Sequence, residues 1–216
     1  SLSPYTTLEN RAETYFPGAT YVSVYSPEED KMVIVPIEEA ISSPFSHAVD
    51  YGSGVFEGSS AIVNERTGVP HVILHEQRMN RMFGKSLPNR GYRSPVSQEE
   101  FGHALLDIVA INGMDLFKDP KGSDKLVRAY IRPTIHPAAL AGFGVSMRKD
   151  YPIDAAIITW AWPDYLNPKV YEKGMTAAIT GHQRLFPITG KHASNYGAAG
   201  TEGSLIRSLG IDELIY

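Results

Sequence analysis

A lysine with small and polar neighbours stands near the C-terminal end of the chain, in the run Gly-Lys-His-Ala-Ser-Asn-Tyr at residues 190–196. An amine attacks an aldehyde only as the free base, so Lys191 would need burial, a nearby positive charge or a neighbouring acceptor to do this chemistry. The small neighbours would let a flat ring pack closely, and Tyr196 could donate to a phenolate oxygen on it. Taken alone, the residue is more typical of a solvated surface lysine.

A second group of candidate residues lies in the run 126–136, where apolar and polar side chains alternate. The alternation predicts a strand with one face in the core and one face toward solvent. If the polar face borders a site instead, Tyr130 and Arg132 could hold a carboxylate, because a guanidinium donates two parallel hydrogen bonds. The strand alone leaves both interpretations open.

Basic residues also gather on a predicted helix over residues 75–86, where Arg78, Arg81 and Lys85 share one face. This pattern is typical of a solvated basic face, and an anion such as phosphate is the alternative explanation. The run Tyr-Gly-Ser-Gly-Val-Phe-Glu-Gly at residues 51–58 matches neither a Walker phosphate loop nor a dinucleotide fingerprint. We interpret it as a tight strand-and-turn segment that brings backbone close to another group.

Composition narrows the class of protein. Of the 216 residues, 43% are hydrophobic and 20% charged, which is ordinary for a soluble globular protein. A net charge of -4 gives no reason to expect nucleic acid, and no apolar run approaches the roughly 20 residues that span a bilayer. The absence of cysteine fits a reducing compartment, and we expect a cytoplasmic protein. The seven histidines show no spacing with carboxylates that suggests zinc, so we predict no metal.

Strands and helices in mixed order must position the candidate residues. We predict strands at 20–26, 32–37, 60–64, 70–74, 125–136, 153–160 and 174–180, a last strand at the C-terminal end, and helices at 75–86, 97–113 and 195–209. Ser97 and Glu100 form the pattern of a capping box at the start of the second helix. Because the elements do not alternate regularly, we predict an α+β fold.

Five segments, in this order, resemble one family. Residues 46–58 resemble the N-terminal signature of the branched-chain aminotransferases, which are fold-type-IV pyridoxal phosphate enzymes. The run Leu-His-Glu-Gln-Arg-Met-Asn-Arg-Met-Phe at 74–83 and the run Ala-Tyr-Ile-Arg-Pro at 129–133 resemble two further segments of that family. Residues 157–166 and 191–196 resemble the last two, so the resemblance runs from about residue 46 to the end of the chain.

The resemblance implies a two-domain fold-type-IV architecture, which is D-amino-acid aminotransferase-like, with pyridoxal 5'-phosphate as cofactor. Lys191 is then the catalytic residue, which carries the cofactor as a Schiff base and acts as general base. Arg81 would grip the cofactor phosphate, and Tyr196 would contact the phenolate oxygen of the ring. The substrate-binding positions that the family implies are Tyr51, Phe56, Tyr130, Arg132 and Tyr165.

The implied reaction is transamination of branched-chain amino acids with 2-oxoglutarate, in a homodimer or higher homo-oligomer whose other partners are a small amino acid and a 2-oxo acid. D-Amino-acid transaminase and aminodeoxychorismate lyase share the fold and are the alternatives within it. The pairing of Tyr-Gly-x-Gly-Val-Phe-Glu-Gly with Tyr-Ile-Arg-Pro favours the branched-chain enzymes over both. A truncated, non-catalytic relative that acts as a binding protein is the alternative from another class.

The chain departs from the family pattern in three places. Asp50 stands directly before Tyr-Gly, where the family usually has a histidine or another residue. The span between Arg184 and Lys191 is shorter than usual, so we expect a remodelled loop there. The chain ends at Tyr216, before the Glu-Gly-x-Gly-Glu-Asn segment whose glutamate pairs with the pyridinium nitrogen. It also ends before the Gly-Ile-Thr-Arg-like turn that cups the phosphate.

The resemblance therefore predicts a division of the chain into three parts. Residues 1–162 would form the small α+β domain with an N-terminal arm, residues 163–169 the interdomain linker, and residues 170–216 the start of the large cofactor-binding domain. We expect the 216-residue chain alone to be a poor catalyst, and interpret it as a fragment of a longer enzyme.

Overall fold

A computed structural model of the chain describes residues 15–40, 45–138, 144–146, 151–163, 168–184 and 189–216. In this part of the chain, one main sheet carries the fold, with strand order β2-β1-β7-β6-β4-β5 and β3 paired to β6 beside that path. A small second sheet pairs β8 with β9. The mixture of helices with a largely antiparallel sheet confirms the α+β prediction.

Two of the predicted strand pairs are hairpins. The first joins β1 (Tyr21–Ser26) to β2 (Lys31–Pro36), and the second joins β4 (Ser59–Val63) to β5 (Pro70–Ile73). Both pairs are antiparallel, as expected for strands joined by a short turn.

The centre of the sheet is the antiparallel pair of β6 (Ala129–Pro137) and β7 (Ile153–Ala161). β6 begins later than predicted, because Leu126 forms an isolated bridge with Lys118 instead of joining β7. The two-residue β3 (Val55–Phe56) pairs with the far end of β6, at Ile135 and Thr134.

A continuous helical rod borders the sheet. It consists of α3 (His75–Arg81), a π-helical turn (Met82–Ser86) and α4 (Leu87–Arg90), so the predicted helix extends to Arg90. The short helix α2 (His47–Tyr51) precedes β3, and α5 (Gln98–Asn112) covers the main sheet. Short 3₁₀ helices (Ile37–Glu39 and Gly113–Phe117) complete this part.

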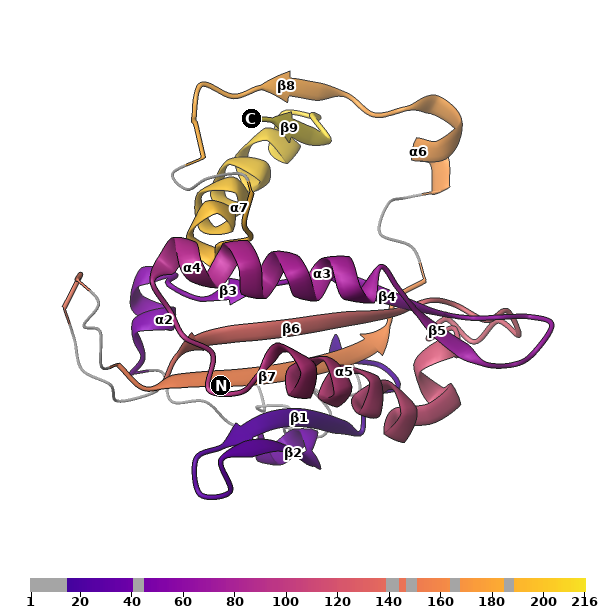
Figure 1. Cartoon of the computed structure of the whole chain (residues 1–216). Helices are drawn as coiled ribbons and strands as arrows, with labels where there is room; N and C mark the ends of the chain where they lie inside the picture. The colour runs from indigo at the N-terminus through magenta and orange to yellow at the C-terminus, as the bar shows by residue number, and fades with distance from the viewer. Residues whose placement is uncertain (1–14, 41–44, 139–143, 147–150, 164–167, 185–188) are drawn as a thin grey trace, which may run out of the picture.

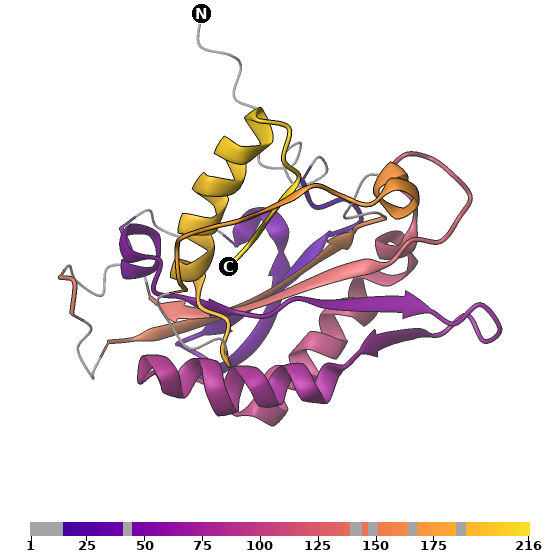
Figure 2. The same ribbon diagram turned by 90° about the horizontal axis from the view of Figure 1, so that it is seen from above.

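The C-terminal residues form α6 (Pro168–Lys173), β8 (Ala177–Ile179), α7 (Ala193–Ser208) and β9 (Glu213–Ile215). Figure 1 shows α7, β8 and β9 gathered at the top of the view, apart from the main sheet. In Figure 2, α5 and α7 lie on opposite sides of β6 and β7.

The start of α5 shows which part of the capping-box prediction holds. The Ser97 side chain accepts a hydrogen bond from the Glu100 backbone N–H, at 3.1 Å, as the pattern predicts. The reciprocal half is wrong, since the Glu100 carboxylate accepts from the Met32 backbone N–H of β2 at 3.0 Å. The glutamate therefore ties α5 to the edge of the sheet.

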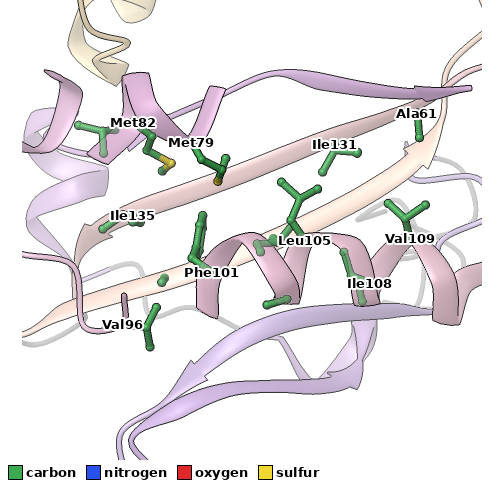
Figure 3. Packing of buried hydrophobic residues seen from close by; sticks show 14 of the residues in the cluster. Ala61, Met79, Met82, Val96, Phe101, Leu105, Ile108, Val109, Ile131 and Ile135 are labelled. Carbon is green, nitrogen blue, oxygen red and sulfur yellow. The ribbon is translucent and has the colours of Figure 1, made fainter. Parts of the chain in front are cut away.

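The core lies between α5 and the sheet (Figure 3). Phe101, Leu105 and Ile108 of α5 are fully buried, and Ile131 and Ile135 of β6 face them across the interface. Side chains at i, i+4 and i+7 share one helix face, which explains why these three positions carry the contact. No helix in the described part of the chain is long and apolar enough to cross a membrane.

Neighbouring leucines of α5 give a direct test of this packing. Leu105 is fully buried, whereas Leu106 is 42% exposed. We expect Leu105→Ala to lower the free energy of unfolding by about 2–5 kcal/mol because it leaves a cavity, and Leu106→Ala to change it by about 0.5 kcal/mol or less. Urea denaturation followed by circular dichroism measures both, and equal losses in the two variants would contradict the placement of α5.

Candidate active site

The segment that carries Lys191 is attached to β3 by backbone hydrogen bonds. The Phe56 N–H donates to the Lys191 carbonyl at 3.3 Å, and the Ala193 N–H donates to the Gly54 carbonyl at 2.9 Å. From the other side, the Lys191 N–H donates to the buried Ser86 hydroxyl at 2.9 Å. The backbone of Lys191 is thereby fixed between β3 and the helical rod.

Gly190 allows this close approach. A Cβ at residue 190 would lie 2.8 Å from the His192 Nε2 atom and 3.0 Å from the Ser86 Cα atom. A larger residue would therefore push the lysine segment away from the rod.

The Lys191 amine lies against two aromatic rings. Its Nζ atom is 4.7 Å from the centre of the Phe56 ring and 4.9 Å from the centre of the Tyr196 ring. The two rings meet edge to face at 4.9 Å. Contacts of this length to ring faces are attractive for a cation and also exclude water from one side of the amine.

This amine borders an open cavity of about 840 Å³. The cavity falls in the size range of small-molecule sites. The described residues that line it lie in or directly next to β3, β4, β6, β7, the helical rod, α6 and α7. They are Phe56, Gly58, Ser60, Arg78, Arg128, Tyr130, Arg132, Thr134, Trp162, Tyr171, Lys191, Ala193 and Tyr196. Four of these described residues are basic and none is acidic, so the cavity favours an anionic ligand.

The polar face of β6 forms one wall of this cavity. Ala129, Ile131 and Ile135 are fully buried on the core face, while Tyr130, Arg132 and Thr134 line the cavity on the other face. Of the two interpretations of the alternating strand, the structure thus favours a polar face that borders a cavity.

Arg132 is held in a defined orientation. Its Nε and Nη2 atoms donate to the Tyr130 hydroxyl at 3.2 and 2.9 Å, and its Cζ atom lies 4.6 Å from the centre of the Phe56 ring. Gly58 makes room for this arrangement, because a Cβ at that position would overlap the Tyr130 hydroxyl.

Arg81 is bound to a residue that sequence reasoning did not select. The Arg81 Nε and Nη2 atoms donate to the two carboxylate oxygens of Glu57, each at 2.6 Å. Glu57 is fully buried, and the Nη1 atom of Arg78 approaches its carboxylate to 3.8 Å. Among the described residues, Arg78 lines the cavity and Arg81 does not. The hydrogen bond to Glu57 raises the pKa of Arg81 above its ordinary value. The sequence held one signal of this ion pair. Glu57 is the one charged residue in the stretch 51–58, and the predicted basic helix face offers it a partner.

Of the predicted substrate-binding residues that the structure describes, Tyr51 is not among those that line this cavity. Tyr51 lies on α2, where its ring packs against His47 at 4.6 Å between ring centres. Tyr165 lies outside the residues that the structure describes. Within the described ranges, no cluster of three or more histidine or acidic side chains could hold a metal ion.

Sequence comparison finds branched-chain aminotransferases. The branched-chain-amino-acid aminotransferase of Escherichia coli (strain K12) is 31% identical over 182 residues, which are 82% of this chain and 53% of that protein. The enzyme of the same name from Salmonella typhimurium is 30% identical over the same length. A search of protein-family models gave no match.

Solved structures agree with the sequence comparison. The structure of the E. coli branched-chain amino acid aminotransferase superposes with a TM-score of 0.73 and 27% identity, over 91% of this chain and 59% of that chain. The chain is thus similar in sequence and fold to branched-chain aminotransferases. The branched-chain aminotransferase of the archaeon Thermoproteus uzoniensis, solved with norvaline, gives a TM-score of 0.72 at 25% identity, again over 91% of this chain and 59% of that one.

These similarities confirm the prediction of a fold-type-IV aminotransferase fold. The chain spans about half the length of the curated branched-chain aminotransferases that it matches. The activity, cofactor, substrate and assembly of the whole enzyme are therefore proposals for this chain.

His192 makes the stability of the site sensitive to pH. Its side chain is fully buried, and burial together with the charge of Arg90 lowers its pKa below the ordinary value. The unfolded chain therefore binds a proton at His192 more readily than the folded one. The resulting stability is present above the unfolded pKa of about 6.5 and is lost as the pH falls through and below that value.

We expect the urea midpoint of the protein to fall between about pH 7 and pH 5, and His192→Asn to reduce the slope of that fall. The matched control is His71→Asn, because His71 is exposed and lies outside the segment that carries Lys191. An unchanged slope in His192→Asn would show that this histidine does not carry the pH dependence.

Proposed function

We propose that the chain is part of a pyridoxal-phosphate-dependent aminotransferase that acts on branched-chain amino acids, with 2-oxoglutarate as the amino acceptor. The observation that carries the proposal is the Lys191 amine, placed against Phe56 and Tyr196 in a cavity that also presents Arg132. The names of the curated relatives support the reaction and the substrate class. A branched-chain amino acid aminotransferase of the same fold that was solved with pyridoxamine 5'-phosphate supports the cofactor.

The residues around Lys191 fit the three chemical features of pyridoxal phosphate. Lys191 would hold the aldehyde carbon through its Nζ atom, and Tyr196 would donate to the phenolate oxygen. Arg81 would bind the phosphate, since its guanidinium is charged and is held by Glu57, which the cavity-lining Arg78 also approaches. When bound, the cofactor supplies the electron sink that makes the substrate α-proton acidic.

Arg132 and Tyr130 would together orient a substrate carboxylate. The Tyr130 hydroxyl accepts both hydrogen bonds from Arg132, so its own proton is available to donate into the cavity. The remaining N–H groups of Arg132 supply charge next to that donor. A carboxylate held at this point would lie against the same wall of the cavity as the lysine amine.

Aromatic rings would receive the branched aliphatic side chain. Phe56 and Trp162 line the cavity with Tyr130, and the Trp162 ring lies 4.6 Å from the Tyr130 ring, centre to centre. Such a wall buries methyl groups without offering them a polar partner. We keep Tyr51 and Tyr165 as proposed substrate-binding residues, on the basis of the family resemblance.

Lys191 would move the proton in the chemical step. Its Nζ atom would take the proton from the substrate Cα and deliver it to the cofactor's aldehyde carbon, which is general acid–base catalysis by one residue. The backbone contacts of Lys191 with Phe56 and Ser86 keep the amine on one side of the site, so the proton would be moved on one face. From the resemblance we also propose a homodimer or higher homo-oligomer, working in the cytoplasm.

Lys191→Ala tests the assignment of the cofactor-binding lysine. We expect the unmodified protein to gain a visible absorption band with pyridoxal phosphate, and Lys191→Ala to lose it, because no other lysine of the described residues lines the cavity. Lys85→Ala is the matched control, because Lys85 is exposed on the helical rod. A band that persists in Lys191→Ala would remove Lys191 from the site.

A single turnover tests the reaction itself. We expect leucine, added to stoichiometric protein loaded with pyridoxal phosphate, to bleach the band and yield the corresponding 2-oxo acid, and 2-oxoglutarate to restore the band. Elimination products in place of the 2-oxo acid would indicate a lyase.

Gly58→Ala tests the orientation of the substrate arginine. The added Cβ would displace the Tyr130 hydroxyl and with it the partner of Arg132. We expect leucine to bind roughly tenfold more weakly, the loss of about one charge-assisted hydrogen bond, while pyridoxal phosphate binding is retained. Gly84→Ala is the control, because a Cβ there meets nothing within 4 Å. Titration of the band with leucine measures the difference, and equal affinity in both variants would contradict the proposed role.

A further inference from the structure

Glu57 is a buried carboxylate with no place in the proposed reaction. It directly follows Phe56 at the end of β3, its side chain is fully buried, and both of its oxygens bond to Arg81. A buried carboxylate is costly unless it is paired, so the pair with Arg81 explains why Glu57 can stand here. The same pair restricts the orientation of the Arg81 guanidinium, the group proposed to bind the cofactor phosphate.

Glu57 occupies one edge of the Arg81 guanidinium and leaves the other edge available. A guanidinium has five N–H groups, and the contact through Nε and Nη2 uses two of them. The three that remain, two on Nη1 and one on Nη2, include a second pair suited to two phosphate oxygens. In the part of the chain that the structure describes, no other acceptor is bonded to these three groups, and the Arg81 side chain is 36% exposed.

The charges around Glu57 favour an anion at that free edge. Arg78 also approaches the Glu57 carboxylate and lines the cavity, so two positive charges share one negative charge. One positive charge remains uncompensated within this group of three side chains. Tyr196, the residue proposed to contact the cofactor ring, lies close enough to raise the pKa of Arg81 further.

We propose that Glu57 is a positioning residue, which holds the Arg81 guanidinium with its free edge toward the cofactor phosphate. This inference rests on the proposed function, because it takes the phosphate of pyridoxal phosphate as the ligand. An unrestrained arginine would lose side-chain entropy when it binds the phosphate, whereas the pair with Glu57 orders Arg81 beforehand. Phosphate affinity therefore depends on a residue that does not touch the phosphate.

The test compares ligands with and without a phosphate group. We expect Glu57→Gln to weaken pyridoxal phosphate roughly tenfold and to leave the affinity for pyridoxal, which lacks the phosphate, unchanged. Glu76→Gln is the control, because Glu76 is an exposed glutamate on α3. Equal losses for pyridoxal and pyridoxal phosphate would show that Glu57 only supports the fold, and unaltered binding of both would equally overturn the proposal.

Two further variants keep the test decisive if Glu57→Gln does not fold. Glu57→Asp keeps the charge but shortens the side chain, so it should lose phosphate selectivity while the protein remains folded. In an Arg81→Lys background, which lacks the two-edged guanidinium, Glu57→Asp should cause no additional loss of selectivity. Full selectivity in Glu57→Asp, or an unchanged additional loss in the Arg81→Lys background, would contradict the positioning role.

Inorganic phosphate separates this inference from the proposed function. It needs no lysine, and the part of its stabilisation of the protein in thermal unfolding that Arg81→Lys removes reports on the site at Arg81. If the protein binds inorganic phosphate through Arg81 and Glu57→Gln abolishes that binding, the positioning role of Glu57 stands. If the same protein does not bind pyridoxal phosphate, the proposed cofactor is rejected. A protein that binds neither would reject both.

Discussion

The nine-residue pairing of β6 with β7 determines which side of the sheet each side chain of β6 faces. A shift of one residue in this register would exchange the two faces, and would carry Arg132 into the core and Ile131 into the cavity. The buried contacts of Ile131 with α5 oppose such a shift, since it would bury an unpaired guanidinium. The hydrophobic core thus sets the position of the polar residues that line the cavity.

Three consecutive residues connect the remaining parts of the site to this sheet. Val55 pairs with Ile135 on one side and forms a bridge to His192 on the other. Phe56 receives the lysine amine and the Arg132 guanidinium on its ring, and Glu57 holds Arg81 on the rod. The run 55–57 therefore places an amine and a guanidinium against one ring and a second guanidinium against a carboxylate. Each of these contacts joins residues that are distant in the sequence.

Local patterns in the sequence predicted most of the elements. The alternation of β6, the two hairpins and the α5 helix follow from residue periodicity and turn chemistry, which act over a few residues. The capping box failed at Glu100, where an interaction with β2 replaced the local hydrogen bond. The role of Glu57 also stayed hidden, because its partner Arg81 lies 24 residues away and depends on how the rod packs against β3. Lys191 was selected only because several segments in order resembled one family, since the residue alone is ordinary.

The most direct measurement of the central claim is to map where pyridoxal phosphate becomes attached to the chain. The protein is incubated with the cofactor, reduced with borohydride, digested, and the labelled peptide is identified by mass spectrometry. Because the Lys191 amine is the one set against Phe56 and Tyr196 in the cavity, we expect the label on the peptide that contains Lys191. A label spread over exposed lysines such as Lys85 and Lys118, or none at Lys191, would contradict this account of the site.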